Sequence, residues 1–324
     1  MNFRQFKYVI TVAECKSFSK AAGKLFISQP SLSQYIQTLE EQLGVRLFDR
    51  TTNPLNLTPA GELYVETARQ ILQLGEQLTR QLSDMANLIE GKITIGASPY
   101  RCKYIVPNVL QIFQKKYPNV SVMLIEKGRA EVQDLLMKGS IDICLTNPPL
   151  KEGAFEYQPL ITEEILLALP PDYEIKELQP EEHETVSNNI TTNTSFAINK
   201  ERPPTRLQIP CVSLQKLKNA PFVLLESDQS LHGTAIDICA LAGFKPKVVL
   251  ENRSFEAALA MVNAGIGVTF IPDTLAKYGM YKDYTYCSIA GLYPTREVLI
   301  AYRKGRYLSK AAFEFINIAK ETFQ

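Results

Sequence analysis

Residues 60–90 contain no proline, and apolar or small residues recur there in an unbroken alternation of four- and three-residue steps. The recurring positions are Tyr64, Ala68, Ile71, Gly75, Leu78, Leu82, Met85 and Ile89. This spacing is typical of a coiled-coil seam and predicts one long helix that pairs with the same helix of a second copy. The alternative is that the helix lies along its own domain. In both cases it separates two regions of different character, residues 1–58 and residues 91–324.

Residues 1–58 are expected to form short helices joined by tight turns. Ser17 and Ser28 can each accept a hydrogen bond as the N-cap of a helix, and Gly44 can end the second of these helices. The second helix carries one apolar stripe, formed by Leu32, Ile36, Leu39 and Leu43. Two short helices joined in this way are typical of a helix-turn-helix. A turn-rich segment at residues 49–56 predicts a short hairpin before the long helix.

The opposite face of the second helix is polar but uncharged. It carries Gln29, Ser33, Gln34 and Gln37. Gln can form paired hydrogen bonds with adenine, and Ser can donate to or accept from a base edge, so this face suits the major groove of DNA. Residues 1–58 hold seven Lys and Arg against four Asp and Glu, a net charge of +3 that favours phosphate contact. An ordinary solvated helix face is the alternative.

From residue 91 onward, predicted strands alternate with predicted helices, which indicates an α/β domain with mainly parallel sheets. The expected strands are 93–97, 120–126, 141–145, 155–160, 164–169, 222–225, 248–250, 267–271, 285–289 and 298–302. The expected helices are 104–117, 129–138, 230–241, 255–264 and 309–323. Residues 172–212 interrupt the alternation, and the abundance of Ser, Thr and Asn within 181–195 predicts a flexible insertion.

Composition limits the possible classes of protein. The 35 Lys and Arg nearly balance 34 Asp and Glu, so the whole chain has no strong field for a polyanion. The six cysteines lack paired metal-ligand spacing, and we expect free thiols in a reducing compartment, with no metal and no cofactor. The N-terminus does not resemble a signal peptide, and no apolar run reaches membrane-spanning length. We therefore expect a soluble, cytoplasmic protein.

No catalytic motif is apparent. The sequence lacks GxSxG, P-loop and HExxH patterns, and Gly265-x-Gly267 precedes a predicted strand, whereas a dinucleotide fingerprint follows one. His232 is a lone histidine that we expect to be solvated or to cap a helix. Cys102 lies between Arg101 and Lys103, cations that could lower its pKa for a redox switch. We therefore expect that the protein is not an enzyme. The rival interpretation is a solute-binding module or small enzyme with a helical interaction domain.

Residues 1–61 closely resemble the DNA-binding half of LysR-type transcriptional regulators. The resemblance lies in the run from Ala21-Ala22 through Ile27-Ser28-Gln29-Pro30-Ser31-Leu32-Ser33, then Leu43-Gly44, Leu47-Phe48-Asp49-Arg50 and Leu57-Thr58-Pro59-Ala60-Gly61. It implies a winged helix-turn-helix at 1–58, a dimerising linker helix at 59–90 and an effector-binding domain at 91–324. That domain would resemble periplasmic binding proteins, with one α/β lobe at 91–162 and 268–324 and another at 163–267.

The resemblance also implies a set of DNA-binding residues. These are Ser28, Gln29, Pro30, Ser33 and Gln34, with Gln37 added from the helix face, and Arg50 and Thr51 near the phosphates at the start of the wing. Family members commonly carry Arg where this chain has Gln34, and basic residues where its wing has Asn53-Pro54-Leu55-Asn56. Fewer cations near DNA predict an affinity that falls less steeply with salt.

A small-molecule effector is expected between the two lobes, where strands end. Ser98, Thr146 and Ser227 each follow a predicted strand there, although each could be a plain loop residue. Arg101 and Lys103 favour an anionic effector, whereas Glu226 could hold an amine, so an organic anion and an amino acid both remain open. The resemblance further implies a homotetramer, effector-dependent DNA bending and a possible contact with RNA polymerase.

Overall fold

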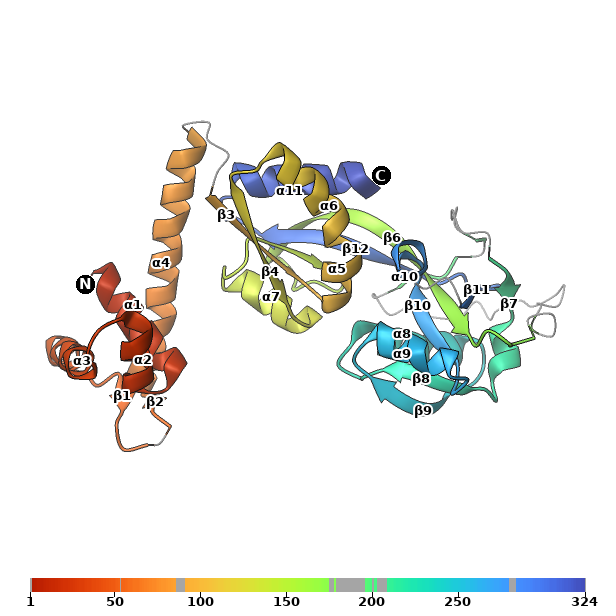
Figure 1. The fold of residues 1–324 in the computed structure, drawn as a ribbon, viewed down its shortest axis with the longest axis horizontal. Helices are drawn as coiled ribbons and strands as arrows, with labels where there is room; N and C mark the ends of the chain where they lie inside the picture. The colour runs from red at the N-terminus through yellow and green to blue at the C-terminus, as the bar shows by residue number, and fades with distance from the viewer. Residues whose placement is uncertain are drawn as a thin grey trace. The chain divides into compact units, whose positions relative to one another are not determined.

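In the computed structural model the chain forms two compact units, Met1–Leu88 and Ile89–Gln324 (Figure 1). The structure describes residues 2–52, 54–85, 91–174, 178, 196–199, 201–202, 209–279 and 284–323. Most of the insertion predicted at 172–212 therefore lies outside the described residues, as do Asn53 of the wing and residues 86–90 of the predicted linker helix.

The first unit is a helix-turn-helix followed by a small hairpin and a long helix. Its elements are α1 (Phe3–Cys15), α2 (Phe18–Leu25), α3 (Gln29–Leu43), β1 (Phe48–Asp49), β2 (Asn56–Leu57) and α4 (Pro59–Met85). The predicted caps are confirmed: the Ser17 side chain accepts from the Lys20 amide, the Ser28 side chain accepts from the Ser31 amide, and Gly44 ends α3 at a φ of +70°. That left-handed conformation favours glycine.

A buried core holds these helices together. The stripe of α3 is buried at Leu32, Ile36 and Leu39, which pack with Val9 of α1 and Phe48 of β1. Burying side chains of this size contributes about 1.5–3 kcal/mol each. The apolar face of α3 is thereby fixed inward, which fixes its polar face outward.

The apolar positions of the coiled-coil pattern in α4 are buried in one part of the helix and exposed in the other. Ala68 is buried, and a Cβ at Gly75 would lie 3.1 Å from the ring of Phe3, so α4 packs on α1 as far as Gly75. Leu78 and Leu82, further along the same pattern, are more than half exposed. The alternative of a helix lying on its own domain thus describes α4 as far as Gly75, whereas Leu78 and Leu82 beyond it stay uncovered within one chain.

The second unit has two lobes that share one long strand, β6 (Phe155–Leu169), seen in Figure 1 running from one lobe into the other. The first lobe contains β3 (Gly91–Ala97), β4 (Val120–Glu126), β5 (Ile143–Thr146), β12 (Thr295–Arg303), α5 (Pro99–Tyr104), α6 (Val106–Lys116), α7 (Arg129–Met137) and α11 (Lys310–Phe323). The second contains β7 (Cys211–Val212), β8 (Pro221–Leu225), β9 (Lys247–Asn252), β10 (Thr269–Pro272), β11 (Thr285–Ile289), α8 (Ser230–Leu241), α9 (Phe255–Asn263) and α10 (Asp273–Tyr278).

The α/β architecture is confirmed, but three local predictions are wrong. The sheets are mixed, because β10, β11 and β12 all pair antiparallel with β6. The strands predicted at 155–160 and 164–169 are one strand, since β12 and then β10 pair along its whole length. The helix predicted at 104–117 is interrupted at Ile105, and a new helix begins with a proline in its first turn, where no amide hydrogen bond is needed.

The predicted boundary between the lobes also needs correction. The chain was expected to return to the first lobe at residue 268, yet Val268, Phe270, Leu275 and Ile289 lie in the core of the second lobe. The reason is that β10 and β11 pair with the C-terminal half of β6. The chain returns to the first lobe only with β12, which begins at Thr295 and pairs with the N-terminal half.

Candidate nucleic-acid interface and effector pocket

The first turns of α3 present a continuous polar surface. Gln29, Pro30, Gln34 and Gln37 are exposed, and Ser33 is half-buried beside them. The hydroxyl of Ser28 accepts from the Ser31 amide at 3.3 Å and donates to the Ser31 hydroxyl at 2.8 Å, which identifies it as a cap. Because the opposite stripe of the helix is buried, these side chains are held on a rigid element at spacings that base edges can match.

Arg50 and Thr51, at the start of the wing, are both engaged within the unit. Arg50 donates to Glu40 at 3.1 Å, and its guanidinium lies 5.4 Å from the centre of the Phe18 ring. Glu40 is buried and also accepts from the backbone amides of Leu47 at 2.7 Å and Phe48 at 3.1 Å. One carboxylate therefore fixes both the wing backbone and the arginine that would approach a phosphate.

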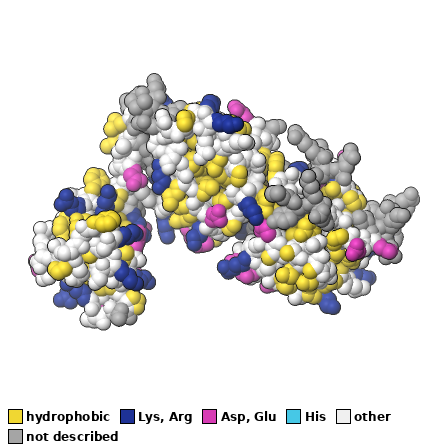
Figure 2. Space-filling model, in the orientation of Figure 1, with side chains coloured by type: hydrophobic (Ala, Val, Ile, Leu, Met, Phe, Trp, Pro, Cys, Tyr) yellow, Lys and Arg dark blue, Asp and Glu magenta, His cyan; other side chains and the backbone are white. Residues whose placement is uncertain are grey.

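Thr51 makes a local turn with Asp49. Its hydroxyl donates at 2.6 Å and its amide at 2.9 Å to the same carboxylate oxygen, and these hydrogen bonds hold the pKa of Asp49 below its usual value. Figure 2 shows Lys and Arg side chains, with few acidic ones, over the visible surface of the first unit. A surface of this sign suits a polyanionic partner.

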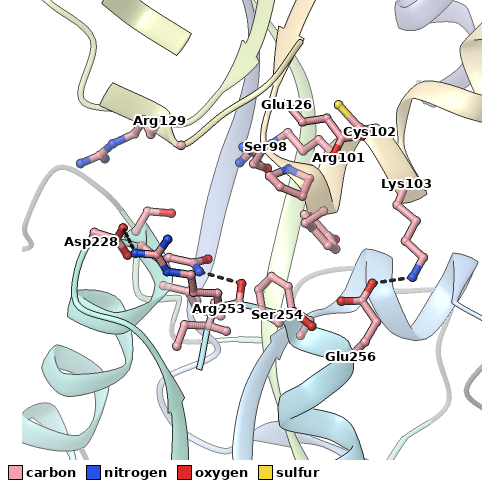
Figure 3. A pocket seen from close by; sticks show the side chains of 18 of the residues that line it. Ser98, Arg101, Cys102, Lys103, Glu126, Arg129, Asp228, Arg253, Ser254 and Glu256 are labelled. Atoms are coloured by element: carbon pink, nitrogen blue, oxygen red, sulfur yellow. Dashed lines mark hydrogen bonds and ion pairs between the residues drawn. The ribbon is translucent and has the colours of Figure 1, made fainter. Parts of the chain in front are cut away.

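The second unit contains a cavity of about 500 Å³ between its lobes. The first lobe supplies Ser98, Arg101 and Arg129, and the second supplies Asp228 and Arg253 (Figure 3). This volume suits a small-molecule ligand. Helix α5 lies between the lobes, because its Cys102 packs in the first core whereas Tyr100 and Tyr104 pack in the second.

Arg101 is the most unusual group of this pocket. Its side chain is only 5% exposed, and it donates to the Ser98 hydroxyl at 3.2 Å and to the side-chain oxygen of Asn147. Its Nε atom finds no hydrogen-bond partner among the described residues. Burial, and then the neighbouring cation of Arg296, lower the pKa of Arg101 to about 10.

A second buried arginine lies nearby and uses the one carboxylate of the cluster. Arg296 donates to Glu163 at 2.8 Å, and Glu163 also accepts from Tyr100 at 3.0 Å and from Thr274. Burial alone would raise the pKa of Glu163, but the two arginines hold it below its usual value. Among the described residues, Arg296 therefore pairs directly with Glu163, whereas Arg101, buried nearby, makes no ion pair of its own.

The lobes are also joined at the rim of the pocket. Lys103 and Tyr104 of α5 donate to Glu256 of α9 at 2.7 and 2.8 Å (Figure 3). Partial burial acts to raise the pKa of Glu256, but the hydrogen bonds outweigh it and lower the pKa to about 2. Glu226, considered above as an amine ligand, is paired with Arg253 at 2.6 Å.

The strand-end residues predicted for the effector do not all reach the pocket. Ser98 and Arg101 line it, but Thr146 is buried within the pairing of β5 and β12, and its neighbour Asn147 contacts Arg101 instead. Ser227 is exposed and is absent from the lining, to which the next residue, Asp228, contributes.

Two comparisons with protein families decide what kind of protein this is. The model for bacterial regulatory helix-turn-helix proteins of the lysR family matches residues 3–62. The model for the LysR substrate binding domain matches residues 86–190 and 194–324. The chain belongs to the LysR family of transcriptional regulators.

Relatives agree with this membership over nearly the whole chain, and a solved structure shares its fold. The uncharacterized HTH-type transcriptional regulator YcgK of Bacillus subtilis is 30% identical over 100% of this chain and 95% of its own length. The regulator AlsR of the same organism is 30% identical over 95% of this chain and 92% of its own. The structure of full-length CbnR complexed with its target DNA superposes with a TM-score of 0.69 at 22% identity, over 99% of this chain and 100% of that one.

In this LysR-family chain, sequence reasoning missed several residues that the structure brings to the two sites. Glu40, Asn147, Glu163 and Arg296 hold the wing or the pocket through contacts between distant segments. A hint was available for Glu163, because two acidic residues interrupt the apolar strand Ile161–Leu169. No local pattern marks Asn147 or Arg296.

The expectation that Arg101 and Lys103 could lower the pKa of Cys102 is wrong. The thiol is buried, and burial, reinforced by Glu126, raises its pKa to about 12, outweighing the effect of Arg101. Such a thiol is a poor nucleophile at neutral pH.

His232 contacts the Leu225 carbonyl oxygen through Nδ1 at 2.8 Å. Among the described residues, no helix is long and apolar enough to cross a membrane.

Proposed function

We propose that this regulator reads operator DNA with Gln29, Pro30, Ser33, Gln34 and Gln37 of α3, while Arg50 and Thr51 contact the phosphates. Gln29, Gln34 and Gln37 are exposed and uncharged on a helix fixed by its buried stripe, which supports direct contact with base edges. The hydroxyl of Ser28 orders the first turn of this helix. The likeness to CbnR, solved with its target DNA, is in keeping with this use of the fold.

The second half of α4 supports a homodimer as the unit that binds DNA. Leu78 and Leu82 belong to the predicted seam, and Leu74 lies one turn before Leu78; the side chains of Leu74, Leu78 and Leu82 are 63%, 57% and 58% exposed in the single chain. Apolar side chains of such a seam are covered when two helices pair. Pairs of dimers would then form a homotetramer, and bending of the bound DNA would control access of RNA polymerase in the cytoplasm.

The effector we propose is a small organic anion bound between the lobes. The observation that carries this proposal is Arg101, a buried guanidinium that has, among the described residues, no partner for its Nε and no carboxylate of its own. A carboxylate could accept from Arg101 and neutralise the excess charge of the pair formed with Arg296. An amino acid would satisfy the same arginine and place its ammonium group toward Glu126, which lines the pocket without an ion-pair partner among the described residues.

A thermal-shift screen of the full chain against small carboxylates and amino acids tests this effector class. A true ligand stabilises by about 2.7 kcal/mol at 100 times its Kd. We expect Arg101→Met to abolish the shift and Glu152→Ala, at an exposed position of the same lobe, to keep it. A ligand shift that survives Arg101→Met would contradict the proposal. Footprinting on DNA upstream of the chain's own gene, with and without the ligand, then tests the coupling to operator binding.

The proposed role is regulation without catalysis. The described residues contain no group of three or more His, Cys, Asp or Glu able to hold a metal ion. The two residues that sequence reasoning considered for chemistry, Cys102 and His232, are respectively buried with a raised pKa and engaged with a backbone carbonyl. Turnover of the stabilising ligand, followed by chromatography of the mixture, would contradict this role.

A further inference from the structure

Phe26 lies in the turn between α2 and α3 with its side chain 95% exposed. No other large apolar side chain among the described residues is so open to solvent. The residues on either side are used differently: Leu25 and Ile27 pack against the core of the first unit, and Ser28 caps α3. The turn is thus anchored through its neighbours, and the aromatic ring of Phe26 contributes no packing to it.

The backbone of Phe26 makes the choice of residue more unusual. Its φ is +55°, in the left-handed region, where it ends α2 by donating its amide to the carbonyl oxygens of Ala22 and Gly23. Gly and Asn adopt this conformation most readily, and a bulky residue there is an outlier. Gly or Asn at this position would therefore make the turn more stable than Phe does. An outlier of this kind points to a use outside the folded chain.

The position of Phe26 identifies the surroundings in which that use would occur. Gln29 lies three positions further along the chain, so the two Cα atoms lie within about 11 Å of each other, or about three base-pair steps. Apart from the backbone of α2 itself, no atom of the described residues lies within 4 Å of the place where a Cβ of Gly23 would be, so the surface of α2 at Gly23 is open. A helix-turn-helix that inserts the start of α3 into the major groove brings this turn to the edge of the same groove.

The chemistry of the ring limits what it can contact there. Phenylalanine offers no hydrogen bond to a phosphate or to a polar base edge. The apolar group that a major groove presents is the C5-methyl of thymine, and Phe is one of the side chains that contact it. We propose that Phe26 is a specificity-determining residue that packs on a thymine methyl at the edge of the operator half-site. This inference rests on the proposal that the start of α3 enters the major groove.

The test compares DNA affinity with folding stability in the full chain. We expect Phe26→Asn to unfold at the same temperature as the wild type or higher, because Asn suits the left-handed turn, yet to bind operator DNA about 5-fold or more weakly. Phe26→Ala should lose affinity similarly. The matched control is Phe313→Ala, at a half-exposed phenylalanine of α11 in the second unit, which should bind DNA as the wild type does.

A second measurement identifies the group on the DNA. Replacing operator thymines one at a time by deoxyuridine removes one methyl each. One such replacement should weaken the wild type about as much as Phe26→Ala does, and should not weaken Phe26→Ala further. Equal sensitivity of both proteins at every thymine would overturn the assignment to a methyl.

The outcomes separate this inference from the function on which it rests. If Gln29→Ala with Ser33→Ala loses affinity while Phe26→Asn binds normally, the role of Phe26 is overturned and the reading by α3 stands. If neither variant changes affinity, the reading by α3 is wrong as well. Normal DNA binding by Phe26→Asn with loss of transcription would overturn the inference in favour of a protein partner.

Discussion

Helix α3 and the pocket between the lobes hold their functional side chains in opposite ways. On α3 the working side chains are uncharged, largely exposed and close together in the sequence, and a buried apolar stripe holds them in place. In the pocket, Arg101 and Arg296 are charged, buried and 195 residues apart; Asn147 accepts from the first, and the carboxylate of Glu163 accepts from the second. Removing a side chain should therefore affect binding at the first site, and both stability and binding at the second.

Glu163→Ala gives the largest effect that this comparison predicts. The change leaves Arg101 and Arg296 buried together without a carboxylate, so the free energy of unfolding of the second unit should fall by about 3–5 kcal/mol. Denaturant titration of the full chain measures it. Glu152→Ala, at an exposed site of the same lobe, should stay within about 0.5 kcal/mol of the wild type. A loss below about 1 kcal/mol for Glu163→Ala would show that the buried charges are not coupled.

Glu40→Ala is the corresponding change in the first unit. It leaves the amides of Leu47 and Phe48 without their acceptor, which should cost about 1–3 kcal/mol. We expect a smaller loss than for Glu163→Ala because Arg50, its cationic partner, is 37% exposed and can be hydrated. Glu41→Ala, one residue further along at an exposed position, is the matched control. If Glu40→Ala lowered the free energy of unfolding more than Glu163→Ala does, the contrast between the units would be wrong.

Acid should weaken the contact between the lobes at the rim of the pocket. The pKa of Glu256 is lowered to about 2 in the folded protein, below its usual value near 4.5, so its stabilisation is present above about pH 5 and lost as the pH falls toward 2. For a partly exposed pair we expect about 0.5–1 kcal/mol. The difference in free energy of unfolding between wild type and Glu256→Gln should shrink over that range. A difference that stays constant would contradict the assignment.

The smallest effect concerns the wing and its lack of cations. We expect the slope of log affinity against log salt to be shallower than about −8, a value that would imply nearly nine neutralised phosphates. Asn56→Lys, at an exposed position of β2, should steepen it by about 0.9 per chain, hence about 1.8 for a bound dimer, if the wing lies against a phosphate. Fluorescence anisotropy at several salt concentrations measures both slopes. A wild-type slope of −8 or steeper would contradict this expectation.

The two sites also differ in how far the sequence predicts them. Helix periodicity and capping are local, so α3, its caps at Ser28 and Gly44 and its outward face follow from residues 28–44 alone. The rule that ligands bind beyond strand ends places Ser98 and Arg101 in the pocket, but it selects Thr146 where Asn147 makes the contact. Arg296 and Glu163 meet because β12 pairs antiparallel with β6, and that long-range pairing was not predicted. The same missed pairing explains the misplaced boundary between the lobes.

Binding of operator DNA by the Gln29→Ala, Ser33→Ala variant tests the central claim most directly. Each lost base contact should cost about 1–3 kcal/mol, so we expect affinity for the operator to fall at least 10-fold while affinity for unrelated DNA and the unfolding temperature stay unchanged. An operator affinity equal to that of the wild type would contradict the claim that this face of α3 reads the sequence.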